Sequence, residues 1–106
     1  MSIEIQRNVA STVYIFTPQT SWALFTFSNT GDIFLQSDWG SYTHRFRAFS
    51  GDIETFLKGL SVEYFVNKLS MQDVNQKPTT YQQKEILTIL VERFIYALNN
   101  ENISKT

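Results

Sequence analysis

The segment WALFTFS-NTG-DIFLQS-DWG-SYTHRFRA, residues 22–48, decides the fold of this chain. It contains three stretches rich in aromatic and β-branched residues, and two short glycine-containing breaks separate them, a pattern typical of strands joined by turns. Gly31 and Gly40 can supply the positive φ that tight hairpin turns require. The segment therefore predicts a meander of three antiparallel strands.

The expected lengths of the two turns fix a register for these strands. A three-residue first turn pairs Phe25 with Leu35, and a second turn made of Trp39 and Gly40 pairs Leu35 with His44. Because side chains alternate across a strand, these pairings group the apolar residues on an inner face. This inner face consists of Phe25, Phe27, Ile33, Leu35, Tyr42, His44 and Phe46.

The opposite face of the predicted meander combines large apolar side chains with two basic ones. It carries Trp22, Leu24, Thr26, Phe34, Gln36, Thr43, Arg45 and Arg47. A register shifted by one residue would bury both arginines without partners, which is costly, so we exclude it. Apolar groups of this size on an outer face indicate that the face is covered or binds something.

The residues on either side of this segment predict one further strand and three helices. Residues 12–17 are β-rich and end before Pro18, whereas Ile3 and Ile5 give only a weak indication of a short edge strand. After Ala48 the spacing of apolar residues becomes helical. We expect Ser50 to cap a first short helix, which carries Asp52 in its first turn.

Capping residues also delimit the two later helices. Gly59 is expected to end the first helix, and Ser61 to begin the second. Thr80 and Gln83 have the spacing of a capping box, which predicts a long helix from Tyr81 to about Leu98. Its apolar arc is wider than a surface helix needs, so the helix either lies between layers or offers a second face to a partner.

These expectations add up to a single α+β domain over residues 1–106. It contains a four-stranded, mainly antiparallel sheet, with two short helices and one long C-terminal helix packed on one face. Residues 72–79 are expected to form a loop, and the tail, about residues 99–106, to fray.

Composition excludes several classes of chemistry. The chain has no cysteine and one histidine, so we expect no disulfide, no metal site and no cofactor. The formal net charge of −1 does not suit a bulk polyanion binder. We identify no membrane span and no signal peptide, and we expect a cytoplasmic protein.

Three features carry a functional and a structural interpretation each. His44 could act as a general base, but a half-buried structural histidine is favoured because no partner is evident. The Asp38-Trp39-Gly40 turn could expose Trp39 as a binding anchor or fold it back over the sheet, and the two interpretations are balanced. Arg45 and Arg47 beside aromatics could hold single-stranded nucleic acid, although ion pairing and cation–π packing are favoured.

The chain also resembles a group of phage proteins. The elements that carry the similarity are, in order, Trp22-Ala23-Leu24-Phe25, Gly31, Ser37-Asp38-Trp39-Gly40 with Tyr42, Arg45-Phe46, Phe56-Leu57 with Leu60, and Tyr64-Phe65 with Lys68-Leu69. In this order they are similar to uncharacterised small proteins of tailed phages and prophages that share a Ser-Asp-aromatic-Gly hairpin. The resemblance implies a bacterial host cytoplasm and carries no catalytic residues.

The leading hypothesis from the sequence is therefore a non-enzymatic interaction protein of phage or prophage type. It would bind a protein partner of host or phage origin, for example to inhibit a host or defence complex, or it would form a homodimer. The candidate binding residues are Trp22, Phe34, Asp38, Trp39, Arg45 and Arg47. The alternative is a module that binds single-stranded nucleic acid through the same aromatic and arginine-bearing face.

Overall fold

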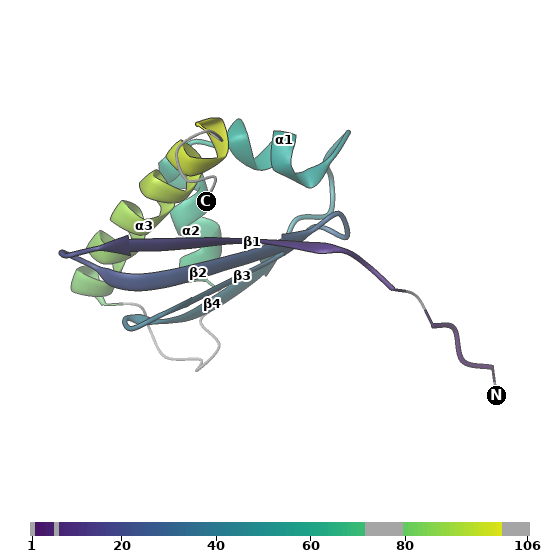
Figure 1. Cartoon of the computed structure of the whole chain (residues 1–106), viewed down its shortest axis with the longest axis horizontal. Coiled ribbons are helices and arrows are strands. Elements are labelled where there is room, and N and C mark those ends of the chain that lie inside the picture. Colours follow the sequence, from purple (N-terminus) through teal and green to yellow (C-terminus); the bar gives the residue numbers. More distant parts are fainter. Residues whose placement is uncertain (1, 6, 72–79, 101–106) are drawn as a thin grey trace.

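The strands precede the helices along the chain. The computed structural model describes residues 2–5, 7–71 and 80–100. Its elements are β1 (Ala10–Thr17), β2 (Ser21–Ser28), β3 (Asp32–Ser37), β4 (Gly40–Arg45), α1 (Ile53–Lys58), α2 (Val62–Ser70) and α3 (Tyr81–Asn99). The strands form one antiparallel sheet in the order β1-β2-β3-β4, and the helices lie on one side of it (Figure 1). The predicted α+β architecture is confirmed.

The first hairpin of the meander has the predicted register, whereas the second differs by two residues. Phe25 pairs with Leu35 as expected. Leu35 pairs with Tyr42 instead of His44, because the turn is formed by Asp38 and Trp39, and Gly40 already belongs to β4. A shift of two residues leaves every side chain on its predicted face, since the side-chain period of a strand is also two.

The core lies between the inner face of the sheet and the helices. The ring of Phe94 on α3 stacks on Phe25 with centroids 4.1 Å apart, and it meets Phe27 and Phe65 edge-on. Such aromatic pairs add to the stabilisation that comes from burying their surface. The strand residues buried in this core are Ala23, Phe25, Phe27, Ile33, Leu35 and Tyr42.

The helices begin at capping residues, with one difference from the prediction. Ser61 caps α2, and Thr80 and Gln83 form both bonds of a capping box at α3. The cap of α1 is Asp52 instead of Ser50, because the Asp52 carboxylate accepts bonds from the amide and hydroxyl of Thr55. A carboxylate at this position satisfies an otherwise unpaired amide of the first turn.

The wide apolar arc of α3 packs against several elements at once. Leu87, Leu90, Val91, Phe94 and Leu98 are buried, and α3 contacts α1, α2 and β1. These contacts bury the centre of the arc, and the part that stays exposed includes Tyr96.

The ends of the chain and the long loop complete the comparison with the sequence. Ile3 and Ile5 belong to no strand, so the short edge strand expected there is wrong. They lie on an exposed segment that extends away from the body as a continuation of β1 (Figure 1). The loop at residues 72–79 and all but the start of the expected tail fall outside the described residues.

Candidate functional site

The face of the sheet opposite the helices bears several aromatic side chains. The pairing between strands sets Phe16 beside Trp22, Tyr14 beside Leu24, and Thr26 beside Phe34. Along each strand these side chains alternate with the buried residues, so they project from the side of the sheet that the helices do not cover. We call this surface the open face.

The aromatic groups of the open face are largely accessible to solvent. Tyr14, Phe16 and Phe34 retain 63%, 62% and 47% of their accessible surface, while Trp22 and Leu24 are half-buried. Residues of this kind are scattered singly on most soluble proteins, and a cluster on one face is typical of an interaction surface.

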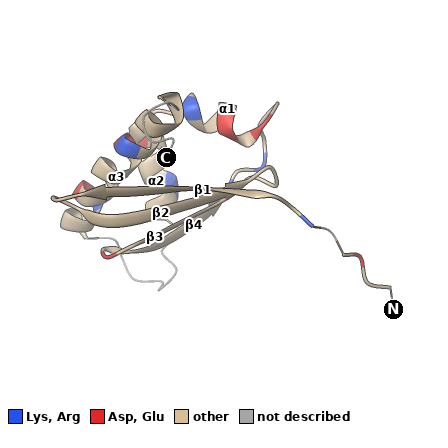
Figure 2. Cartoon of the chain, in the orientation of Figure 1, with Lys and Arg blue, Asp and Glu red and all other residues tan. Residues whose placement is uncertain are grey.

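The open face is nearly free of charge except at its two ends. Within the four described strands the charged residues are Asp32 and Arg45, and Figure 2 shows the strands almost entirely in the neutral colour. Arg45 pairs with Asp32 across β3 and β4, with Nε and Oδ1 3.0 Å apart. At the other end, the Trp22 indole donates to Asp38 Oδ1 at 2.6 Å. The middle of the face therefore carries no charge, with uncharged polar side chains such as Thr26 and Gln36 between its large apolar ones, and the charges lie at its ends.

The sequence left open whether Trp39 is an exposed binding anchor or folds back over the sheet. In the structure Trp39 makes contacts with other parts of the fold. Its indole Nε1 donates to the Thr20 carbonyl at 3.1 Å, and its own carbonyl accepts from Gln83 Nε2 at 3.2 Å. These bonds tie the β3–β4 turn to the β1–β2 turn and to the first turn of α3. Trp39 thus holds the end of the sheet against the helices.

The six candidate residues from the sequence consequently fall into two groups. Trp22, Phe34, Asp38 and Arg45 come together on or at the ends of the open face. Trp39 has the contacts given above, and Arg47 follows the end of β4 and is exposed.

His44 lies on the inner face of β4 at the margin of the core. It is half-buried, and its ring meets Phe46 edge-on with centroids 4.6 Å apart. Burial lowers the pKa of His44, and the positive charge of Lys68 lowers it further. Both effects favour the neutral imidazole, which packs against Phe46 at the edge of the core.

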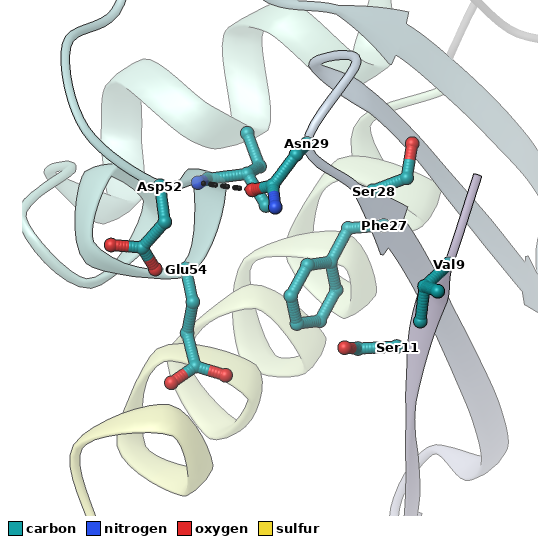
Figure 3. Close-up of a pocket in the computed structure, with 8 residues that line it drawn as sticks. Val9, Ser11, Phe27, Ser28, Asn29, Asp52 and Glu54 are labelled. Carbon is teal, nitrogen blue, oxygen red and sulfur yellow. Dashed lines mark hydrogen bonds between the residues drawn. The ribbon is translucent and has the colours of Figure 1, made fainter.

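A pocket of about 220 Å³ lies where β1 and the end of β2 meet the start of α1 (Figure 3). Two of its polar side chains, Asn29 and Asp52, hold the start of α1 in place. Asn29 Oδ1 accepts from the Ile53 amide at 3.0 Å. The side-chain and backbone bonds from Thr55 lower the pKa of Asp52. The pocket therefore offers capping groups and no catalytic pair.

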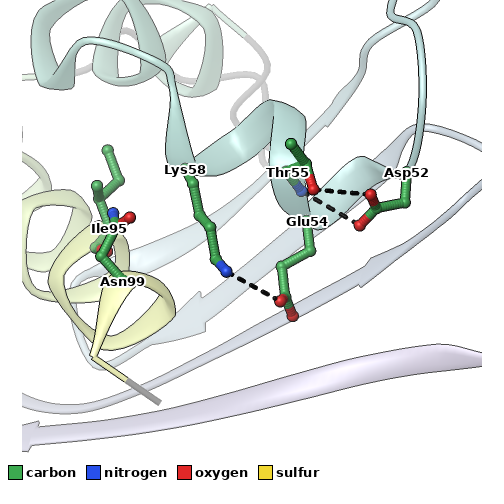
Figure 4. Close-up of polar contacts among 6 residues, drawn as sticks. All are labelled: Asp52, Glu54, Thr55, Lys58, Ile95 and Asn99. Carbon is green, nitrogen blue, oxygen red and sulfur yellow. Dashed lines mark hydrogen bonds and ion pairs between the residues drawn. The ribbon is translucent and has the colours of Figure 1, made fainter.

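The remaining carboxylate of this pocket also has a structural partner. Glu54 and Lys58 form an ion pair one helical turn apart, with 3.4 Å between Oε2 and Nζ (Figure 4). A partly exposed pair of this type contributes little to stability. The open face is the stronger candidate site.

Within residues 2–5, 7–71 and 80–100, no group of three or more His, Cys, Asp or Glu side chains could hold a metal ion. In the part of the chain that the structure describes, no helix has both the length and the apolar character needed to cross a membrane.

Tyr14 and Phe16 are site residues that the sequence analysis did not assign. In β1 the positions of both faces are apolar, with Val13 and Ile15 alternating with them, so no contrast in polarity identifies the outer side. Pairing with β2 identifies it, because Tyr14 lies opposite Leu24.

The chain was compared with known proteins at three levels. The model of a family named Phage_phiTE_072, described as a phage family, matches residues 3–106. Neither the curated proteins nor the solved structures yielded a match.

Proposed function

Because this chain belongs to that phage family, we propose that it is a non-enzymatic phage protein that binds another protein through its open face. It would act in the cytoplasm of the bacterial host, where its partner is a phage or host protein. Inhibition of a host or defence complex is one way in which such binding takes effect. In this role the chain would use no catalytic residue, metal or cofactor.

The observation that carries this proposal is the uncovered aromatic group of Tyr14, Phe16 and Phe34. Three rings on one side of a sheet leave apolar surface in water that the fold itself does not need. Burying such surface gains roughly 25 cal/mol per Å², so a protein that covers it gains affinity from each ring. Aromatic residues are also those that dominate the energies of measured interfaces.

The charges of the open face favour a protein over a nucleic acid. Arg45 is already paired with Asp32, and the carboxylate of Asp38 lies at the opposite end. Binding to single strands requires a groove with excess positive charge as well as rings for stacking. The open face has the rings without the charge.

The test is affinity capture followed by measurement with purified components. The immobilised chain is exposed to lysate from infected host cells, each captured protein is identified and purified, and its affinity is measured by calorimetry. Phe34→Thr keeps a β-forming residue while removing a ring at the centre of the face. We expect it to weaken binding by roughly 30-fold, the equivalent of about 2 kcal/mol.

A matched control separates this effect from a general loss of apolar surface. Tyr64 on α2 is 45% exposed, close to the 47% of Phe34, and it faces away from the sheet core. Tyr64→Gln should leave the affinity unchanged. Equal effects of the two substitutions would contradict the assignment of the open face. Binding of an oligonucleotide that weakens steeply with salt would favour the nucleic-acid alternative.

A further inference from the structure

We propose that the N-terminal arm, residues 2–5 and 7–9, pairs with the free edge of β1 in a second copy of this chain, whose own arm pairs in the same way with the first copy. This contact goes beyond the proposed function, because it uses the edge of the sheet instead of its open face. It accounts for Ile3 and Ile5, whose side chains are 79% and 84% exposed in a single copy.

The strand that receives the arm, β1, lies at one edge of the sheet. Among the described residues it pairs on one side only, with β2, so alternate amide and carbonyl groups along its other side point away from the sheet. Its helix-side residues Val13 and Ile15 are half-buried, whereas those of β2 are fully buried. Residues 10–17 contain no charged residue and no proline, which are features that often keep a further strand from an edge. The edge is therefore open to another strand.

The arm has the side-chain pattern of such a strand. It continues β1 and leads away from the body, so it does not reach the edge of its own β1 (Figure 1). Ile3, Ile5 and Val9, which are 79–89% exposed, continue the alternation of Val13 and Ile15. In an extended strand all five side chains lie on the helix side of the sheet. An apolar stripe of this period is typical of a strand that becomes half-buried.

A two-fold axis restricts the ways in which two copies of this strand can pair. Both copies use the same surface, so the arm and β1 together must complement themselves when they run in opposite directions. Successive residue pairs of an antiparallel ladder alternate between hydrogen-bonded and non-hydrogen-bonded types. The axis maps each pair onto a pair of the same type, so it passes through one pair and sets a residue opposite its own copy.

One of the allowed registers matches apolar residues with apolar residues. An axis at Val9 sets Ile5 opposite Val13 of the second copy and Ile3 opposite Ile15. Symmetry repeats both pairs. Cross-strand pairs of β-branched side chains stabilise a sheet, and here they also cover the half-buried side chains at the edge of β1.

The neighbouring registers lose this match. An axis one residue earlier sets Ile5 opposite Ser11, and an axis one residue later sets Arg7 opposite Val13. A displacement of two residues sets Arg7 opposite its own copy or opposite Ile15. Each of these arrangements either loses an apolar pair or places a guanidinium group against an apolar side chain or a like charge, which is unfavourable. The register at Val9 is therefore selected.

The same register brings Arg7 to a pocket with negative charge. Arg7 falls opposite Ser11 of the second copy, which lines the pocket between β1 and the start of α1. Asp52 and Glu54 lie across that pocket from Ser11 (Figure 3), and Lys58 offsets only one of these two charges. Arg7 thus interrupts the apolar stripe of the arm at a position where the second copy offers carboxylates. Complementary charges fix the relative orientation of partners.

The dimer should be weak and reversible. An arm that becomes ordered loses conformational entropy, which offsets part of the gain from the new ladder. The contact is one strand wide on each copy and belongs with the small interfaces of transient complexes. We therefore expect the dimer to be the main species at a chain concentration of about 1 mM and to dissociate on dilution.

Cysteine cross-linking tests the register directly, because the chain has no cysteine of its own. Val9→Cys sets the two introduced thiols opposite each other at the axis, where paired Cα atoms lie about 4.5–5.5 Å apart, within the span of a disulfide. Ile5→Cys is the matched control, since Ile5 is similarly exposed but its two copies lie roughly 27 Å apart along the ladder. Under mild oxidation Val9→Cys should form a covalent dimer at least about tenfold faster than Ile5→Cys. A mixture of Ile5→Cys and Val13→Cys should form the mixed dimer.

Sedimentation equilibrium of the full chain measures the dimer without a cross-link. Ile5→Ser removes an aliphatic side chain at both symmetric contacts and should raise the dissociation constant by roughly tenfold. Met71→Ser is the matched control, because it removes an apolar side chain of 73% exposure at the end of α2, and it should have no effect.

Charge reversal tests the contact between the arm and the pocket. Arg7→Glu or Glu54→Arg alone sets like charges against each other at both contacts, so the dissociation constant should rise by at least about fivefold. In an equimolar mixture the introduced glutamate faces the introduced arginine at one contact, and the native charges meet at the other. The mixed dimer should therefore regain the affinity of the unmodified chain.

Each measurement has an outcome that would overturn the inference. An unmodified chain that stays monomeric at about 1 mM does not form the contact. Equal cross-linking of Val9→Cys and Ile5→Cys would indicate random collision instead of a fixed register. A dimer that Ile5→Ser leaves unchanged, or a mixture of the charge variants without recovery, would place the contact elsewhere. Capture of a different protein through Ile5 by a monomeric chain would assign the arm to that protein.

Phe34→Thr keeps this inference apart from the proposed function. Phe34 lies on β3, which β2 separates from the edge strand β1. The substitution should leave the dimer unchanged while it weakens the capture of a different protein by the open face. A monomeric chain that still captures its partner through Phe34 would overturn the dimer alone, and a dimeric chain whose captured partner does not depend on Phe34 would overturn the open-face proposal alone.

Discussion

Replacing Gly31 with alanine should destabilise the fold far more than the same change at Gly51 or Gly59. Gly31 occupies the first turn of the meander with φ of +91°. A Cβ added there would lie 2.0 Å from the carbonyl oxygen of Phe46, which is a backbone atom that cannot rotate away. The chain must shift, and the 2.9 Å bond from the Phe46 amide to the Gly31 carbonyl is the first contact affected.

The magnitude follows from separable contributions. A side chain in the left-handed region costs about 1–2 kcal/mol, and the loss of the hydrogen bond costs about 1 kcal/mol more. Displacing Phe46, which is buried against Phe56 and Phe65, adds to this. The smaller conformational entropy of unfolded alanine offsets about 0.4–1 kcal/mol. We expect the free energy of unfolding to fall by about 2–4 kcal/mol.

Two other glycines provide graded controls for a urea denaturation series. Gly51 also has positive φ, +79°, but nothing lies within 4 Å of an added Cβ, so Gly51→Ala isolates the cost of the backbone conformation. Gly59 has φ of −91° with its nearest neighbour at 3.7 Å, and Gly59→Ala should be close to neutral. The urea concentration at the unfolding midpoint should be lowered least by Gly59→Ala, more by Gly51→Ala and most by Gly31→Ala. Equal losses at Gly51 and Gly31 would refute the contact between the first turn and Phe46.

Four further substitutions test other parts of the account. Thr80→Ala removes the cap of α3 and should lower the free energy of unfolding by about 1 kcal/mol, measured by urea denaturation, with Thr88→Ala as an exposed-helix comparison. Trp39→Phe keeps an aromatic ring but loses the bond to the Thr20 carbonyl, and the free energy of unfolding should fall by about 1 kcal/mol; an unchanged midpoint would show that this bond contributes nothing. Ser21 has φ of +63°, so Ser21→Gly should leave stability unchanged or raise it by up to about 1 kcal/mol in thermal unfolding, and a clear loss would contradict the conformation of the β1–β2 turn. Because the folded-state pKa of His44 is lowered, the unfolded chain binds more protons on acidification, so stability should fall as pH drops from about 6.5 through the folded pKa; His44→Gln should remove this component of the pH profile, and an identical profile would rule it out.

The sequence predicted the architecture because local signals agreed with one another. Aromatic and β-branched stretches broken by Gly31 and Gly40 defined the strands, and Thr80 with Gln83 defined the start of α3. The faces of β3 and β4 were correct even though their register was off by two residues. The face on which a side chain lies alternates from one residue to the next, so a shift of two residues in the pairing leaves every side chain on the same face.

Most of the features that the sequence did not determine depend on contacts between distant segments, and one depends on a local choice between two capping residues. The cap of α1 is Asp52 because Thr55 lies within reach of its carboxylate, whereas Ser50 was an equally acceptable residue type. Trp39 could have been an exposed anchor, and its bond to Thr20 spans nineteen positions. Tyr14 lies on the open face because β1 pairs with β2 so that Tyr14 is opposite Leu24, and the composition of β1 does not indicate this pairing.

Nuclear magnetic resonance of the aromatic rings tests most directly whether the open face is the binding surface. Ring signals of the chain are recorded with increasing amounts of a purified binding partner. The account predicts that the signals of Tyr14, Phe16 and Phe34 shift or broaden together, while those of Tyr64 and Tyr96 stay unchanged. Changes confined to Tyr64 and Tyr96 would contradict it, because the partner would then occupy the helical side of the molecule.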